Sequence, residues 1–180
     1  MILEINSPGG TIYGSKAIAD GVQYYSQKTG KPTMSFISGL AASGAYWAAV
    51  STDTVYADSG SVIGSIGIVS GPFKYYDEPI AENGGVFSGG VVTNKGIETI
   101  TITAGKYKDM GNPYRKLSKE EIASLQRMAD TVYGDFVSYV STKRDIDRTV
   151  LVDDVGALVF DPKTATTHKL IDGEFNREDS

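Results

Sequence analysis

The spacing of apolar residues alternates between two periods along the first part of the chain. Short apolar runs predict strands, and the segments between them show helical spacing. The strands are predicted over residues 1–6, 32–38 and 54–58, and the helices over residues 13–31 and 41–51. Residues 61–70 alternate Gly and Ser with Ile and Val, which favours another strand that its surroundings approach closely. This order predicts an α/β fold whose strands are parallel.

The second part of the chain begins without a clear period. Residues 71–96 are rich in Gly and aromatic residues and are interpreted as a long loop or a small hairpin. Residues 97–103 alternate apolar and polar side chains, which predicts a strand. Residues 117–144 predict a long helix with a capping box and an apolar stripe, and residues 158–172 a strand followed by a short helix. The box is Ser118 with Glu121, and the stripe is Ile122, Leu125, Met128, Val132 and Phe136.

Composition excludes several kinds of protein. The 180 residues suffice for one domain with a core, and the net charge of -5 argues against nucleic acid as a partner. The absence of cysteine excludes disulfides, thiol nucleophiles and Cys-ligated zinc. No apolar run is long enough to span a membrane, and no signal peptide opens the chain, so we expect the polypeptide as given to be soluble.

One hydroxyl group stands among small residues in GLAASGAYWAA, residues 39–49. Ser43 is predicted at a strand-to-helix junction, where free N–H groups and the helix dipole can hold a developing oxyanion. The adjacent Gly44, together with Gly9 and Gly10 in NSPGG, would leave N–H groups uncovered by side chains. The alternative is structural: Ser43 as a helix cap, the alanines as a packing contact, and NSPGG as a plain turn.

A serine nucleophile requires a base. The only histidine, His168, follows a threonine pair with no evident carboxylate to orient it, and is interpreted as a surface or packing residue. A lysine can serve if it is uncharged, and bringing its pKa near 7 costs roughly 4 kcal/mol, which demands burial. Lys106 and Lys108 are both candidates, although most lysines are solvated surface residues. Ser65, between glycines, could hold the amine, or could be a polar residue in a tight strand.

Four stretches taken in order resemble signal peptide peptidase A and its relatives, the serine peptidase family S49. They are INSPGGT, GLAASGAYWAA, GSIGIV and AGKYKDMGNPYRKLSKEE, and the resemblance covers nearly the whole chain. It implies the fold shared by Clp proteases and crotonases, built of stacked βαβ units. It also implies that Ser43 is the nucleophile, Lys108 the general base and Ser65 a residue that positions the lysine. Gly44 and the Gly9–Gly10 loop would supply the oxyanion N–H groups, without cofactor or metal.

The same resemblance shapes the expected organisation. We expect one S49 peptidase domain over residues 1–175, with residues 71–96 as a Gly-rich insertion or loop and 176–180 as a tail. Family members carry a membrane anchor and further α/β structure before the NSPGG strand, so we expect an N-terminally truncated chain. Membrane association would then require the missing anchor, with the catalytic domain outside the cytoplasm. The expected partners are a remnant signal peptide or other extended apolar peptide and further copies of the chain.

Three other functions compete with a Ser-Lys endopeptidase. A Clp-type protease requires a histidine about 25 residues after the serine, where this chain has Ile68. A crotonase-like acyl-CoA enzyme would use the same N–H groups for a thioester enolate and would not need Ser43. A catalytically inactive assembly scaffold would tolerate loss of the serine or the lysine, and both are present.

Overall fold

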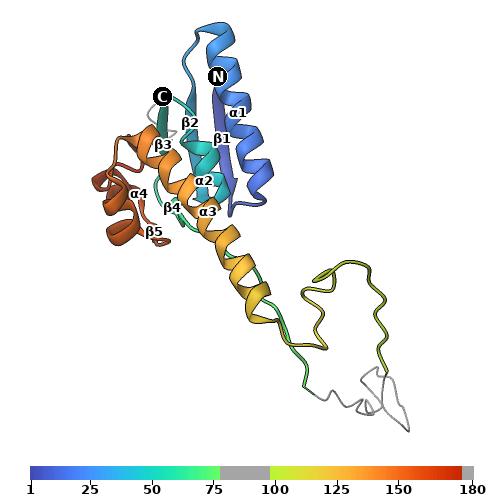
Figure 1. Cartoon of the computed structure of the whole chain (residues 1–180). Coiled ribbons are helices and arrows are strands. Elements are labelled where there is room, and N and C mark those ends of the chain that lie inside the picture. The colour runs from blue at the N-terminus through green and yellow to red at the C-terminus, as the bar shows by residue number, and fades with distance from the viewer. Residues whose placement is uncertain (78–97, 176–180) are drawn as a thin grey trace, which may run out of the picture. The chain divides into compact units, whose positions relative to one another are not determined.

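The computed structural model describes residues 1–77 and 98–175 (Figure 1). The chain divides into two compact units, each described by itself below: residues 1–69 with 129–180, and residues 70–128. The helices and strands are β1 Ile2–Ser7, α1 Ile12–Thr29, β2 Met34–Ala42, α2 Gly44–Ala49, β3 Thr54–Ala57, β4 Val62–Gly64, α3 Lys119–Arg144, η1 Val150–Val155 (a π-helical turn), β5 Val159–Phe160, α4 Pro162–Thr167 and β6 Gly173–Glu174.

A six-stranded sheet forms the centre of the first unit. Its strands run in the order β5-β4-β2-β3-β6, and β1 pairs with β2 as well. Every pairing is parallel except that of β4 with β5. The α/β fold with mostly parallel strands is therefore confirmed. At the end of β2, Ala41 pairs with Ser7 of β1 and with Ile63 of β4, so the ends of β1 and β4 both lie beside the junction that leads to Ser43.

Helix α2 is buried between the sheet and the other helices. Its small residues allow this close approach, and Tyr46 and Trp47 fill the space that remains. The indole of Trp47 stacks on Phe136 of α3, with ring centroids 4.5 Å apart. The Tyr46 hydroxyl donates to the carbonyl of Leu170 at 2.7 Å, which ties α2 to the segment between α4 and β6. These contacts fix α2, and with it the residue that precedes it.

Only part of the apolar stripe of α3 belongs to this core. Phe136 is buried with its neighbours Val137 and Val140, and Val132 packs against them. Earlier in the helix, Ile122 and Met128 are 53% and 54% exposed. The predicted stripe thus correctly identified a helix, but burial extends along its second half only.

The predicted strand over residues 97–103 is wrong for the described residues, since 98–103 form no strand. Ile100 and Ile102 are 75% and 92% exposed. Alternation supplies the pattern of a strand but not the partner that its N–H and C=O groups need. Residues 71–77 form neither helix nor strand, and most of the Gly-rich stretch up to residue 96 lies outside the described residues, as does the tail 176–180.

Residues 105–116 of the second unit form successive tight turns. Backbone N–H groups of Lys108, Met110 and Asn112 each donate to a carbonyl three residues earlier. Positive φ angles at Gly105, Tyr107 and Gly111 permit these reversals. Within the described parts of the chain, no helix has the length and apolar character needed to cross a membrane.

Candidate active site

Ser43 lies at the turn between β2 and α2, in an unusual backbone conformation. Its φ and ψ are 53° and -126°, a region that favours glycine and costs a non-glycine residue about 1–3 kcal/mol. The turn is held by backbone hydrogen bonds: Ser43 N–H donates to Gly64 O at 2.9 Å, and Trp47 N–H donates to Ser43 O at 3.1 Å. Although Ser43 occupies the N-cap position, its side chain makes no capping hydrogen bond. The capping role that would explain this serine structurally is therefore not observed.

The loop after β1 lies directly against Ser43. A Cβ atom added to Gly9, whose φ is +113°, would be 2.9 Å from Ala42 O and 3.0 Å from both Gly44 N and the Ser43 Cβ. A Cβ atom on Gly44 would be 3.4 Å from Gly10 N and only 2.1 Å from the hydroxyl oxygen of Ser15. Glycine is therefore required at Gly9, where the backbone is in the way, and at Gly44 any larger residue would need the Ser15 side chain to move.

The N–H groups of this loop are not equivalent. Gly9 N–H donates to the Ser7 hydroxyl at 3.2 Å, and that hydroxyl in turn donates to Gly9 O at 3.3 Å. Gly10 N–H has no acceptor among the described residues of the chain. The N–H of Gly44, at the start of α2, has no acceptor within its own helix. Of the three expected oxyanion donors, Gly44 and Gly10 are thus available, whereas Gly9 N–H is already used.

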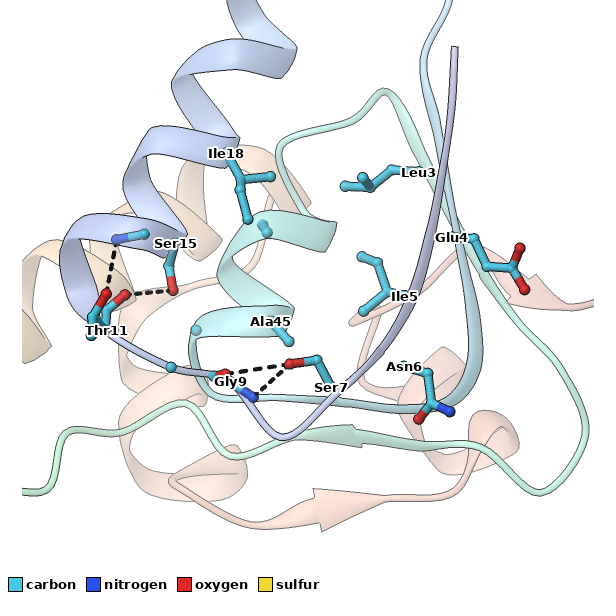
Figure 2. Close-up of a pocket in the computed structure, with 14 residues that line it drawn as sticks. Leu3, Glu4, Ile5, Asn6, Ser7, Gly9, Thr11, Ser15, Ile18 and Ala45 are labelled. Carbon is cyan, nitrogen blue, oxygen red and sulfur yellow. Dashed lines mark hydrogen bonds between the residues drawn. The ribbon is translucent and has the colours of Figure 1, made fainter.

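A cavity of about 380 Å³ opens beside this loop (Figure 2). Its wall is mostly apolar, with Leu3 and Ile5 of β1 facing Ile18 of α1 and Ala45 of α2. Backbone and hydroxyl groups from Ser7 to Ser15 form the remaining side. Thr11 accepts the N–H of Gly14 at 3.1 Å through its side chain, and its carbonyl accepts the Ser15 hydroxyl at 3.0 Å. These bonds fix the first turn of α1, and the Ser15 side chain of that turn lies close to Gly44 at the start of α2.

Ser65 also lies close to this junction. The pairing of Ala42 with Gly64 ends the β2–β4 ladder, so the next residues along the two strands are Ser43 and Ser65. Ser65 is half-buried, has a φ of 54°, and donates its N–H to Leu158 O at 2.7 Å. The structure therefore brings together five of the expected site residues in one unit: Ser43, Ser65, Gly44, Gly9 and Gly10.

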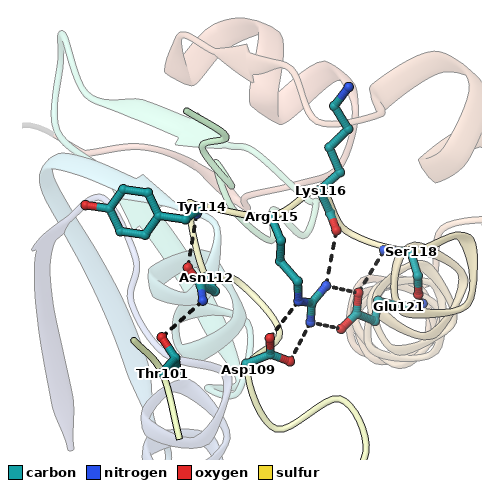
Figure 3. Close-up of polar contacts among 8 residues, drawn as sticks. All are labelled: Thr101, Asp109, Asn112, Tyr114, Arg115, Lys116, Ser118 and Glu121. Carbon is teal, nitrogen blue, oxygen red and sulfur yellow. Dashed lines mark hydrogen bonds and ion pairs between the residues drawn. The ribbon is translucent and has the colours of Figure 1, made fainter. Parts of the chain in front are cut away.

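The two candidate lysines belong to the second unit, and both are exposed. The side chain of Tyr107 raises the pKa of Lys106, which keeps that ammonium group protonated and is the wrong direction for a base. Lys108 lies two residues further along the chain, and the next residue, Asp109, pairs with Arg115 (Figure 3). A lysine that acts as a base must be neutral, which requires desolvation of its amine. The pairing of Lys108 with Ser43 stays a prediction.

His168 ends helix α4, where its ring contacts that of Phe160 with centroids 5.0 Å apart. This contact agrees with its interpretation as a packing residue. Among residues 1–77 and 98–175, there is no group of three or more His, Cys, Asp or Glu side chains arranged to hold a metal ion. Sequence reasoning missed Ser7, Ser15 and Arg115, because their partners become evident only once the chain is folded.

Comparison with known proteins gives a matching family model and several relatives that are named as proteases. The sequence model described as peptidase family S49 matches residues 25–179. The chain is 33% identical over all of its length to "Putative protease MJ0651" of Methanocaldococcus jannaschii, covering 53% of that protein. It is 28% identical over 96% of its length to "Putative signal peptide peptidase SppA" of Enterococcus faecium, covering 46% of it. It is also 30% identical over 98% of its length to "Protease 4" of Haemophilus influenzae, and this match covers 26% of that protein. The chain thus spans about half of the first two relatives.

Proposed function

Because the chain belongs to peptidase family S49, we propose that it acts as a serine endopeptidase with Ser43 as the nucleophile and Lys108 as the general base. The observation that carries this proposal is the backbone at Ser43, whose φ of 53° is kept although its hydroxyl caps nothing. Strained backbone of this kind is found at functional sites, where the fold sustains its cost in order to aim a side chain.

In the proposed reaction, the neutral amine of Lys108 removes the proton from the Ser43 hydroxyl. The resulting alkoxide attacks the carbonyl carbon of a peptide bond and forms a tetrahedral intermediate. The ammonium of Lys108 then protonates the leaving nitrogen, and the C–N bond breaks to leave an acyl group on Ser43. The same amine next activates a water molecule, which releases the second product. We propose that bound peptide excludes water from Lys108 and so favours its neutral form.

The oxyanion is assigned to the N–H groups of Gly44 and Gly10. Gly9 N–H already donates to the Ser7 hydroxyl, which leaves the next glycine as the donor from this loop. The role proposed for Gly9 is steric, since only glycine allows the loop to lie against Gly44. Preorganised N–H donors of this kind contribute about 3–4 kcal/mol each to transition-state stabilisation. Ser65, which follows Gly64 at the end of β4, is proposed to orient the Lys108 amine by a hydrogen bond.

The proposed substrates are extended apolar peptides, remnant signal peptides among them, with small residues next to the cut. The similarity to the Enterococcus faecium protein named as a signal peptide peptidase supports this class of substrate. The wall of the nearby cavity is mostly apolar, which suits an apolar peptide. We also propose that copies of the chain associate, since Ile122 and Met128 of the α3 stripe are exposed.

A fluorophosphonate probe with intact-mass detection tests the nucleophile. One probe should attach per wild-type chain, at Ser43, and none should attach to Ser43→Ala. Ser65→Ala serves as the matched control, because it removes a neighbouring hydroxyl yet should still be labelled, more slowly. Absence of wild-type labelling would refute the proposal and favour the scaffold or acyl-CoA alternative. Labelling that survives in Ser43→Ala would show that another residue is the reactive nucleophile.

A further inference from the structure

Among the described residues, the side chain of Arg115 links the segment that carries Lys108 to the start of helix α3. Residues 105–116 have no helix or strand of their own, so the position of Lys108 depends on turns and side-chain contacts. Figure 3 shows Arg115 between Asp109, on the loop, and Glu121, in the first turn of α3. Asp109 is the residue immediately after Lys108, so whatever holds Asp109 also restricts the lysine.

All five N–H donors of Arg115 are used. Its Nε and Nη2 donate to the two carboxylate oxygens of Asp109, both at 2.7 Å. Nη1 and Nη2 donate to the two oxygens of Glu121 at 2.8 and 2.6 Å. The remaining donor of Nη1 reaches Lys116 O at 3.1 Å. Two bidentate pairs on one planar guanidinium fix direction as well as distance, which a lysine at this position could not do.

The other end of this contact is the N-terminus of α3. The Glu121 side chain, which is 1% exposed, also accepts the N–H of Ser118 at 2.8 Å. Ser118 accepts the N–H of Glu121 at 3.1 Å through its hydroxyl, which completes the predicted capping box. Both carboxylates remain ionised at neutral pH, because Arg115 lowers the pKa of Asp109 and lowers that of Glu121 to about 2. Arg115 therefore pairs with two ionised carboxylates, one on the loop and one on α3, at neutral pH.

We propose that Arg115 is a positioning residue for Lys108: through Asp109 it holds the lysine segment in register with the start of α3. This inference rests on the proposed function, in which Lys108 is the base. The arrangement links a helix terminus to the neighbour of the proposed base, and misplacement of a catalytic group by about 1 Å costs roughly 100-fold in rate.

The test uses Arg115→Lys, with Arg144→Lys as the matched control. Arg144 also forms a bidentate pair, with Asp172 at 3.0 Å for both bonds, but in the first unit. Arg115→Lys should lower kcat for an apolar fluorogenic peptide roughly 10- to 100-fold while KM stays within about 2-fold. Arg144→Lys should keep the wild-type kcat at temperatures below its own Tm.

Two more measurements keep the outcome decisive. Asp109→Asn removes the negative charge and one of the two oxygens that accept from Arg115, and leaves the Arg115–Glu121 pair and the capping box intact. It should therefore lower kcat even if Arg115→Lys fails to fold. Guanidinium at millimolar concentration should restore part of the kcat of Arg115→Ala and none of that of Lys108→Ala. If Lys108→Ala is inactive while Arg115→Lys and Asp109→Asn keep the wild-type kcat, the positioning role is overturned and the base stands. If Lys108→Ala is fully active, the proposed function itself fails.

Discussion

Replacing Gly44 by alanine tests whether the close approach of two backbones is the source of activity. The added methyl group would be 2.1 Å from the Ser15 hydroxyl oxygen, 3.2 Å from Ser15 Cβ and 3.4 Å from Gly10 N. Real Cβ atoms essentially never have neighbours closer than 3.0 Å, so the first contact must be relieved. Since φ at Gly44 is not in the left-handed region, the effect is steric rather than conformational.

Relief can come from the side chain or from the backbone. Rotating the buried Ser15 hydroxyl away breaks its hydrogen bond to Thr11 O, at a cost of about 0.5–1.5 kcal/mol. Moving the backbones apart instead separates the N–H groups of Gly44 and Gly10, and losing one oxyanion donor lowers kcat by about 10²–10³-fold. Overpacking of this kind destabilises by about 1–3 kcal/mol, which at about 2–4 °C per kcal/mol lowers Tm by several degrees.

The assay pairs peptide hydrolysis with thermal unfolding in a rescue design. Gly44→Ala should lose roughly 100-fold in kcat, and Ser15→Gly in the same chain should restore a large part of it by removing both Ser15 atoms from the contact. Ser15→Ala should restore less, because its Cβ remains 3.2 Å away. Gly21→Ala in α1, where an added Cβ meets nothing within 4 Å, is the control and should keep the wild-type kcat. A wild-type kcat in Gly44→Ala, or no recovery with Ser15→Gly, would refute the reasoning.

Three further predictions concern other parts of the chain. His168→Ala should keep its full kcat for peptide cleavage, because the ring packs on a neighbouring aromatic ring. A folded but inactive His168→Ala, together with an active Lys108→Ala, would contradict the lysine as base. Tyr46→Phe leaves the buried Leu170 carbonyl without its donor, which should lower the free energy of unfolding by about 1–3 kcal/mol and Tm by a few degrees. An unchanged Tm would show that this hydrogen bond adds no stability. The pKa of Glu121 is lowered from 4.5 to about 2, so its carboxylate stabilises the fold fully above pH 4.5 and loses this effect as pH falls toward 2. The Tm difference between wild type and Glu121→Gln should therefore narrow over that interval, and a constant difference would contradict the assignment.

The sequence predicted features that depend on neighbours in the chain. Periodicity and capping act over a few residues. The sequence therefore predicted the parallel strands, the short helix after Ser43 and the capping box of Ser118 with Glu121. The strand expected at 97–103 was wrong for its described residues for the complementary reason: alternation is local, whereas strand pairing requires a distant partner.

The residues of the candidate site likewise fall into those that local sequence predicts and those that only the folded chain reveals. Ser43 and its glycines could be singled out because small residues around one hydroxyl are unusual in a local window. The Ser15 hydroxyl over Gly44 could not be foreseen, since that contact exists only when α1 packs on α2. Arg115 was equally hidden, because an arginine near acidic residues is common on protein surfaces, and only the folded geometry gives it two bidentate partners.

The most direct measurement of the central claim is the rate at which Ser43 reacts with a fluorophosphonate as a function of pH, followed by intact mass in wild type and Lys108→Met. Wild-type labelling should accelerate as pH rises, because the amine acts only when it has lost its proton. Lys108→Met should react at least roughly 100-fold more slowly and without that acceleration, while its thermal unfolding matches the wild type. Labelling of Ser43 in Lys108→Met at the wild-type rate, with the same dependence on pH, would contradict the Ser-Lys assignment.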